Sequence, residues 1–411
     1  MYLRSLVAIG LLGACATDDE YAPRVCTEAR AETVGPSTLI DVLLVVDATT
    51  SMADQAAELA RFVDDLDFAL DNNGIGTADV HLAVVTSDLG AGGVPGCDDT
   101  GDGADFQGAA RCGLDGAYLR DVADGDARDR NFTADRGEVL ACLIAAPATT
   151  CPVSQPLTAA VRALDGSVAG NLGFRRTGAL LAVLVLTDGD DCSLTDPDAL
   201  AVAAGNDVEG AVDFACFARG ATCSPANLSA GVHRDCVPRA DRGLADPVAL
   251  AARLDDLGAS WTVIGATAAS ADVAVLAGSR LGPVCSPSGG PVRGPAPRLS
   301  ALGDGTARRA IVDGCVMPEQ ELVEGTIQPF KSDLGIPCLS ANILLETCVG
   351  VWRDGDQILD PDVPACSDAT SGALCYRLID LDFGCPFGVG VDNTGVVPRG
   401  VVEVSCEVPC G

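Results

Sequence analysis

The chain has 411 residues, of which 48% are hydrophobic and 4% aromatic. That length allows two domains or one large domain with insertions, and the hydrophobic content argues against wholesale disorder. The formal net charge of −32 argues against a nucleic-acid partner, because the phosphate backbone would repel the protein.

The amino-terminal residues form an export pattern. Arg4 supplies a positive charge, "SLVAIGLLGA" a short apolar region, and "LGAC" places Cys15 after small residues. This resembles a bacterial lipobox, in which the chain is cut before the cysteine and the cysteine carries a lipid. We therefore expect a lipoprotein signal peptide over 1–14 and a lipid on Cys15 that anchors the protein to the membrane of the cell envelope, facing the periplasm or the outside. An ordinary secretory signal is the alternative.

Cysteine usage indicates an oxidising compartment. The chain has 19 cysteines, and setting Cys15 aside leaves an even number that can pair completely. Four pairs are close in the chain, although proximity does not fix which cysteines bond: Cys97 with Cys112, Cys142 with Cys151, Cys216 with Cys223, and Cys366 with Cys375.

Residues 15–37 are polar and read as a linker, after which strand and helix patterns alternate over 38–317. Strands are expected at 38–46, 78–86, 178–188 and 260–267, and the first is apolar on both faces, as in a central parallel strand. Helices are expected at 52–70, 138–146, 155–166, 246–258 and 270–282. This alternation predicts a Rossmann-like, doubly wound, mostly parallel α/β sheet.

Two cysteine-containing insertions interrupt this pattern, at about 87–135 and 193–242. From about 318 to 411 the chain becomes rich in Gly, Pro and Cys, with short strand-like stretches such as "YRLIDLDF" and "GVVEVSC". We expect this tail to be a small β-rich appendage held by disulfides.

Two buried strands end in an acid, Asp47 in "LLVVDATTS" and Asp188 in "LVLTDGDDCS". Ligands of open α/β sheets collect beyond the carboxyl ends of the strands. Two carboxylates brought together there repel each other, and a hard divalent cation compensates for that repulsion. Thr49 and Ser51 follow Asp47 at alternate positions, so an extended loop points their hydroxyls the same way.

These stretches carry a family resemblance. "VVDATTSM" resembles the DxSxS motif of von Willebrand factor type A (vWA) domains, and "VLTDGDD" is similar to the strand end that supplies their second acid. The resemblance covers roughly Leu39 to Leu281, and with the lipobox and cysteine-rich tail the chain is similar to bacterial envelope lipoproteins that contain a vWA domain. It implies a vWA fold with a metal-ion-dependent adhesion site for Mg²⁺ or Mn²⁺.

The resemblance also implies the ligands. Asp47, Thr49 and Ser51 take the positions of the first motif, with Thr49 replacing its first serine, and Asp188 is the late acid. A further threonine is expected from "PATTCPVSQPL", where Thr150 is favoured and Thr149 is the alternative. The function implied is metal-dependent adhesion at the cell envelope, with the acidic side chain of a partner protein or peptide completing the coordination.

These residues also allow other interpretations. Ser51 or Thr50 would also cap a helix over 52–70, and the metal and disulfides would also suit a structural protein in which they only stabilise the fold. A metal-dependent hydrolase or phosphatase is disfavoured, because Thr49 stands where a phosphatase needs its second acid. His81 and His233 lack a nucleophile motif nearby, so we expect no enzyme.

Two further groups of acids occur in the chain. The loop 98–105, "DDTGDGAD", alternates acids with glycines and offers a Ca²⁺ site, although it lacks a distal glutamate at the spacing of an EF-hand. Asp190 and Asp191 adjoin Asp188 and either tune the field of the site or lie exposed on the surface.

Overall fold

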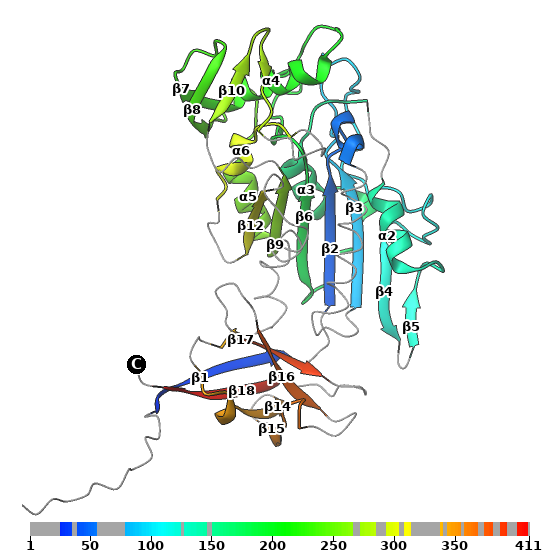
Figure 1. Cartoon of the computed structure of the whole chain (residues 1–411). Helices are drawn as coiled ribbons and strands as arrows, with labels where there is room; N and C mark the ends of the chain where they lie inside the picture. The colour runs from blue at the N-terminus through cyan, green and yellow to red at the C-terminus, as the bar shows by residue number, and fades with distance from the viewer. Residues whose placement is uncertain are drawn as a thin grey trace, which may run out of the picture.

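The computed structural model describes residues 25–34, 39–55, 79–124, 127–145, 150–265, 272–284, 293–303, 308–313, 338–339, 343–354, 357–368, 374–380, 387–392 and 401–409. Figure 1 shows an α/β body and a smaller all-β body. The α/β body carries the strand ends that the sequence singled out.

The α/β body is built on a seven-stranded sheet with the order β12-β9-β6-β2-β3-β4-β5. Its first five strands in that order run parallel, and β4 and β5 extend it antiparallel beyond β3. The strands are β2 (Leu39–Val46), β3 (Asp79–Thr86), β4 (Leu119–Asp124), β5 (Ala127–Arg130), β6 (Leu180–Leu186), β9 (Ala259–Gly265) and β12 (Arg309–Asp313).

Both faces of the central strand β2 are buried, which is why its sequence is a continuous aliphatic run. Val42 and Leu44 pack on one face in a cluster with helix α2, and Leu43 and Val45 pack on the other face with α3 and α5. Fully burying such a side chain contributes about 1.5–3 kcal/mol. The helices are α2 (Arg136–Ile144), α3 (Pro156–Leu164) and α5 (Pro247–Asp256).

The fold class expected from the sequence is therefore confirmed: a mostly parallel, doubly wound α/β sheet with disulfide-bonded insertions and a β-rich carboxyl-terminal part. The second insertion forms helix α4 (Val208–Gly220) and strands β7 (Ala221–Ser224) and β8 (Gly231–Pro238). These elements lie beyond the carboxyl ends of the central strands (Figure 1).

The insertion recruits a later segment that the sequence analysis placed in a helix over 270–282, and that prediction is wrong. The segment is a hairpin of β10 (Val273–Leu276) and β11 (Arg280–Leu281), in a small sheet ordered β11-β10-β8-β7. Its turn uses positive φ at Gly278 and Ser279, and Val273 and Val275 are buried against the insertion. Pairing with β8 outweighs the local helical pattern.

The all-β body joins both ends of the described chain. Its sheets are β1-β18-β14-β15 and β13-β17-β16, formed by β1 (Val25–Val34), β13 (Cys338–Leu339), β14 (Val349–Asp354), β15 (Gln357–Val363), β16 (Cys375–Asp380), β17 (Phe387–Asp392) and β18 (Val401–Pro409). The linker expected over 15–37 is thus corrected in part, because β1 is an antiparallel partner of β18. Cys15 and the signal segment lie outside the described residues.

The remaining short elements are 3-10 turns and one short helix: η1 (Thr50–Gln55), η2 (Ala169–Asn171), η3 (Leu345–Thr347) and α6 (Pro297–Ser300). The rest of the helix expected over 52–70 lies outside the described residues. None of the helices that are described has the length and apolar character needed to cross a membrane.

Six disulfides lie within the described residues: Cys97–Cys151, Cys112–Cys142, Cys192–Cys216, Cys223–Cys236, Cys348–Cys406 and Cys366–Cys375. Of the four sequence-close pairs, Cys366 and Cys375 are bonded to each other. Cys348–Cys406 lies within the all-β body, and the remaining four bonds join the insertions to the α/β core or close them internally. This number of disulfides fits an exported protein that folds in an oxidising compartment.

Candidate metal centre

Three neighbouring parallel strands end together at the candidate centre. β2 runs in register with β6, Val46 opposite Leu186, and with β3, Val46 opposite Thr86. The chain continues with backbone bonds from Asp47 N to the Leu186 carbonyl at 2.8 Å and from Ser87 N to the Val46 carbonyl at 3.0 Å. The residues just past the three strands are therefore held side by side.

Asp47 is the anchored acid of this group. Its carboxylate is buried and accepts four hydrogen bonds. Oδ1 accepts from Thr49 N at 3.1 Å and Ser87 Oγ at 3.1 Å, and Oδ2 accepts from Ser154 Oγ at 2.8 Å and Thr187 Oγ1 at 2.6 Å. Four donors satisfy a carboxylate that the fold removes from water.

Asp188 lies close to Asp47 and has fewer hydrogen-bond donors than Asp47 has. It is 5% exposed, and the Ser51 hydroxyl donates to it. Burial and the nearby negative charge of Asp47 raise the pKa of Asp188 to about 7. The Ser51 hydroxyl and the nearby Arg293 guanidinium lower this pKa but do not offset burial and Asp47, so the charge of Asp188 is only partly compensated.

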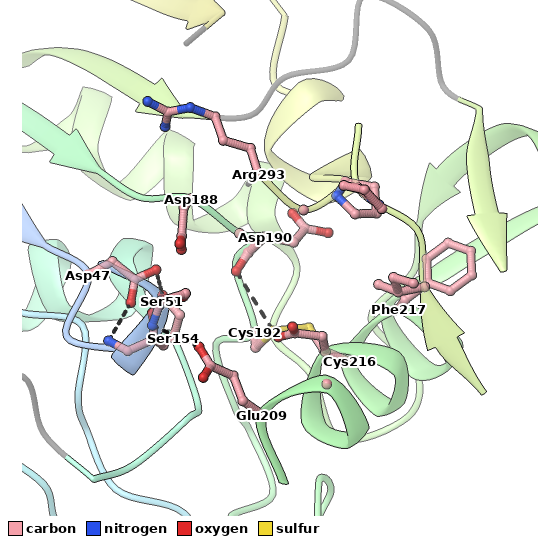
Figure 2. A pocket seen from close by; sticks show the side chains of 18 of the residues that line it. Asp47, Ser51, Ser154, Asp188, Asp190, Cys192, Glu209, Cys216, Phe217 and Arg293 are labelled. Carbon is pink, nitrogen blue, oxygen red and sulfur yellow. Dashed lines mark hydrogen bonds between the residues drawn. A yellow bond between two sulfur atoms is a disulfide. The ribbon is translucent and has the colours of Figure 1, made fainter. Parts of the chain in front are cut away.

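The two hydroxyls of the first motif lie between these acids. Thr49 is 5% exposed, and its Oγ1 is 3.1 Å from Ser51 Oγ. Figure 2 shows Asp47, Ser51, Ser154 and Asp188 converging on one side of the pocket. The alternating spacing of the motif thus places oxygen atoms together, as expected.

The centre opens into a pocket of about 310 Å³ whose far wall comes from the second insertion. Helix α4 contributes Glu209 and Asp213, and the segment before α6 contributes Arg293. Burial and the charges of Glu209 and Asp188 raise the pKa of Asp213 well above its ordinary value. The pocket therefore concentrates negative charge around the strand ends.

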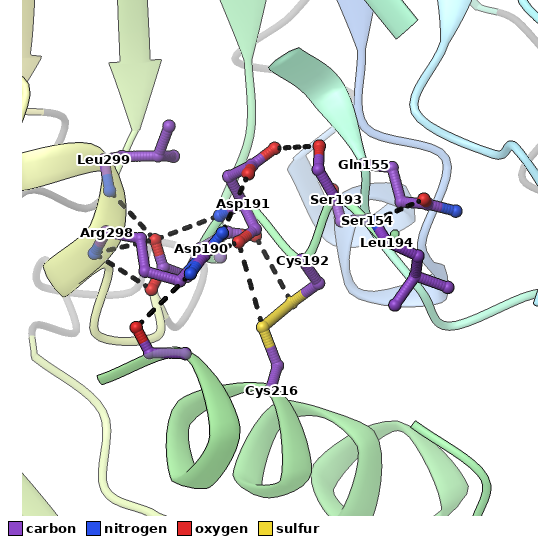
Figure 3. The surroundings of a disulfide bond; sticks show 12 residues. Ser154, Gln155, Asp190, Asp191, Cys192, Ser193, Leu194, Cys216, Arg298 and Leu299 are labelled. Atoms are coloured by element: carbon purple, nitrogen blue, oxygen red, sulfur yellow. Dashed lines mark hydrogen bonds and ion pairs between the residues drawn. A yellow bond between two sulfur atoms is a disulfide. The ribbon is translucent and has the colours of Figure 1, made fainter. Parts of the chain in front are cut away.

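Asp190 and Asp191 have structural partners. Asp190 accepts from the backbone N–H groups of Arg298 and Leu299 at 3.0–3.1 Å. Asp191 accepts from Leu157 N at 3.2 Å at the start of α3 and pairs with the fully buried Arg298 guanidinium at 3.6 Å (Figure 3). These acids fix the loop after Asp188 against two helix starts.

Asp47, Thr49, Ser51 and Asp188 lie together as the sequence predicted, and whether they bind a metal stays a prediction. Thr150 does not join them. It is exposed, and its hydroxyl donates to the Gly96 carbonyl at 2.6 Å, because the Cys97–Cys151 disulfide draws this segment toward the first insertion. Thr149 lies outside the described residues.

Ser154 occupies the place that was assigned to Thr150. Its backbone is fixed on both sides, since Gln155 N donates to the Ser87 carbonyl at 2.9 Å and Cys192 N donates to the Ser154 carbonyl at 2.8 Å. The stretch "PATTCPVSQPL" contains this serine, so the sequence predicts the right segment, and the hydroxyl that reaches Asp47 is that of Ser154 rather than that of Thr150. No sequence signal pointed to Glu209 or Asp213.

The loop 98–105 does not gather its acids. Asp98 Oδ1 accepts from the Thr100 and Gly101 amides, and Asp102 Oδ2 accepts from Thr86 Oγ1 at 2.5 Å. Among the described residues, which include this loop, no group of three His, Cys, Asp or Glu side chains is placed so that it could hold a metal ion. The Ca²⁺ alternative therefore has no support from the geometry.

The donors at the strand ends fit a hard divalent cation. They are carboxylate and hydroxyl oxygens, which suit Mg²⁺ and Mn²⁺. The two pocket cysteines, Cys192 and Cys216, are bonded to each other and offer no thiolate. The partly compensated Asp188 is the group that a cation would satisfy. No group of three or more His, Cys, Asp or Glu side chains that could hold a metal lies within the described residues, so the proposed ligand set includes the hydroxyls of Thr49 and Ser51.

Comparison with known proteins gives only distant similarity. No protein-family model matches the chain, and no curated protein matches it. Among solved structures, the pilus adhesin SpaC of Lactobacillus rhamnosus GG has a TM-score of 0.35 at 11% identity, covering 93% of this chain and 41% of SpaC. Proximal thread matrix protein 1 of the mussel byssus, solved with a zinc-occupied MIDAS motif, has a TM-score of 0.33 at 11% identity. The match covers 74% of this chain and 48% of the byssus protein.

A von Willebrand factor type A protein of Catenulispora acidiphila has a TM-score of 0.27 at 10% identity, covering 96% of this chain and 68% of its own. The chain spans less than half the length of the adhesin and of the byssus protein. None of these similarities is close enough to assign the chain to a family.

Proposed function

We propose that the protein is a metal-dependent binding protein of the bacterial cell envelope. A divalent cation, Mg²⁺ or Mn²⁺, is held by Asp47, Thr49, Ser51 and Asp188, directly or through water. Such a cation neutralises both acids and retains an open position, which the Asp or Glu side chain of a partner protein fills. The partner is thereby bound through the metal.

The observation that carries this proposal is the contrast between the two acids. Asp47 is fully hydrogen-bonded, whereas Asp188 is buried beside it with the Ser51 hydroxyl as donor. A fold that keeps a carboxylate in this state without a cation loses stability. The pocket beside Asp188 is large enough for a partner's side chain.

Binding is favoured over catalysis by the positions of the histidines. His81 Nδ1 is 2.8 Å from the Phe174 carbonyl, and His233 lies between the carbonyls of Pro225 and Ser229. Neither histidine lines the pocket at the strand ends. Proton transfer there would have to rely on carboxylates that the proposed metal already uses.

The test is calorimetric titration of Mg²⁺ and Mn²⁺ into the wild type, Asp47→Asn and Asp99→Asn. Asp99 is an exposed aspartate of the first insertion and serves as the matched control. We expect binding by the wild type and by the control, and at least a hundredfold weaker binding by Asp47→Asn with unchanged circular dichroism. Equal heats for all three proteins would contradict the metal site.

Partner binding and location are tested separately. A pull-down from envelope extracts with the wild-type protein should retain a partner in Mg²⁺ and lose it in EDTA. For the anchor, we propose lipid on Cys15, so that labelled palmitate is incorporated into the wild type and not into Cys15→Ser. Incorporation into both or into neither would remove the anchor from the proposal.

A further inference from the structure

Helix α4 places a carboxylate of the protein's own beside the proposed metal position. Glu209 Oε1 accepts from Ser51 N at 3.3 Å, and its Oε2 accepts from the Thr50 hydroxyl. Ser51 therefore joins two acids, since its hydroxyl donates to Asp188 and its amide to Glu209. In Figure 2 the Glu209 carboxylate is directed toward this group of residues.

We propose that Glu209 occupies the position of the partner's carboxylate, so that the second insertion covers the site and a partner binds by displacing Glu209. This inference rests on the proposed function. The partners of Glu209 are donors, the Ser51 amide and the Thr50 hydroxyl. These two donors, of which Ser51 lines the pocket, are equally suited to an incoming carboxylate.

The position of Glu209 is built into the fold. The Cys192–Cys216 disulfide joins α4 to the loop that begins at Asp188. Figure 3 shows this disulfide, with Cys216 on the helix and Cys192 on the loop. The start of α4 is fixed by Asp207, whose side chain accepts from Gly210 N and pairs with Arg280 of β11. Glu209 thus stands on a helix that is held at its start by Asp207 and in its second half by Cys216.

This arrangement sets what a partner must offer. A single acidic side chain would exchange one carboxylate for another, and it would meet the negative charge of Asp213 one helical turn beyond Glu209. A stable complex therefore requires further contacts with α4 or with the neighbouring hairpin. The insertion acts as a selectivity element that rejects small free carboxylates.

The test uses Mn²⁺ and acetate as probes and measures the water-proton relaxation rate of the Mn²⁺ complex, which falls when acetate replaces a bound water. The proteins are the wild type, Glu209→Gln, Thr50→Val and Glu138→Gln. Glu138 is an exposed glutamate in the first turn of α2 and is the matched control. Thr50→Val keeps all charges and removes one of the two bonds to Glu209.

We expect all four proteins to bind Mn²⁺. Acetate should act at a roughly tenfold lower concentration on Glu209→Gln, the effect of losing one charge-assisted hydrogen bond. Thr50→Val should be intermediate, and Glu138→Gln should equal the wild type. Mn²⁺ binding with equal acetate response in all variants overturns the inference and leaves the proposed function standing. A shift in Glu209→Gln without one in Thr50→Val shows an effect of charge alone and also overturns it. A wild type that binds no Mn²⁺ overturns both.

Discussion

Replacing Asp188 by Asn is expected to stabilise the protein in the absence of metal. Burial and the charge of Asp47 raise the pKa of Asp188 from its ordinary 3.8 to about 7. Each pKa unit corresponds to about 1.4 kcal/mol, so ionised Asp188 costs up to about 4 kcal/mol above neutral pH. Asparagine has nearly the same shape and keeps an acceptor for the Ser51 hydroxyl. We expect a gain of about 2–4 kcal/mol in the free energy of unfolding near pH 8.

The pH dependence follows from the direction of the shift. The unfolded chain gives up this proton near pH 4 and the folded protein near pH 7, so the wild type loses stability as the pH rises through that window. The advantage of Asp188→Asn should therefore grow from about pH 4 to about pH 7 and then stay constant.

Urea denaturation in EDTA near pH 5 and pH 8 measures this difference. The Trp352→Phe background leaves Trp261, buried in the central sheet, as the fluorescent reporter of the α/β body. Added Mg²⁺ should stabilise the wild type by mass action and leave Asp188→Asn unchanged, reversing their order. If Asp188→Asn is the less stable protein in EDTA near pH 8, the charge of Asp188 is already compensated and the main reason for a cation disappears.

Three further predictions concern buried polar groups, two of them beside the site and one at the opposite end of the sheet. Ser154→Ala removes one of the four donors to Asp47 and should weaken Mn²⁺ binding about tenfold by calorimetry; unchanged affinity would exclude Ser154 from the site. Arg298→Met leaves Asp191 buried without its cation and should cost about 3–5 kcal/mol in urea denaturation, whereas a loss under 1 kcal/mol would contradict this role. Burial opposes the charge of Asp121, but guanidinium bonds from β5 outweigh it and lower its pKa. The stability lost in Asp121→Asn should therefore be largest above about pH 4 and shrink below it, and a loss independent of pH would argue against this pairing.

The parts of the fold that the sequence predicted are those determined by local pattern. The aliphatic run of β2 is apolar at every position from Val42 to Val46, which fits a strand buried on both faces. The ends of α3 and α5 match the expected helices within two residues, and each begins with a proline at its first position. Asp47 and Asp188 followed from the rule that adjacent parallel strands end at one edge.

The errors came from contacts between distant segments. The stretch 270–282 has a pattern compatible with a helix, yet β8 lies beside it and offers strand pairing. Thr150 and Ser154 are both hydroxyls ahead of α3, and a disulfide to the first insertion decides which of them reaches Asp47. Glu209 is 158 residues from Ser51 in the chain, so no local pattern connects them.

The acids around the pocket differ in how the protein compensates each of them, and this difference separates structure from function. Asp47 has four hydrogen-bond donors, Asp190 has the backbone at the start of α6, and Asp191 has Arg298. These three acids have several partners within the fold, although burial raises the pKa of Asp190 to about 7 and also raises the pKa of Asp191. Asp188 has a similarly raised pKa but fewer donors, with the Ser51 hydroxyl as its hydrogen-bond partner, and it lies in a pocket that an inserted helix closes with a further carboxylate. The proposed function accounts for that opening, because a cation bound at Asp188 would stay accessible to a partner.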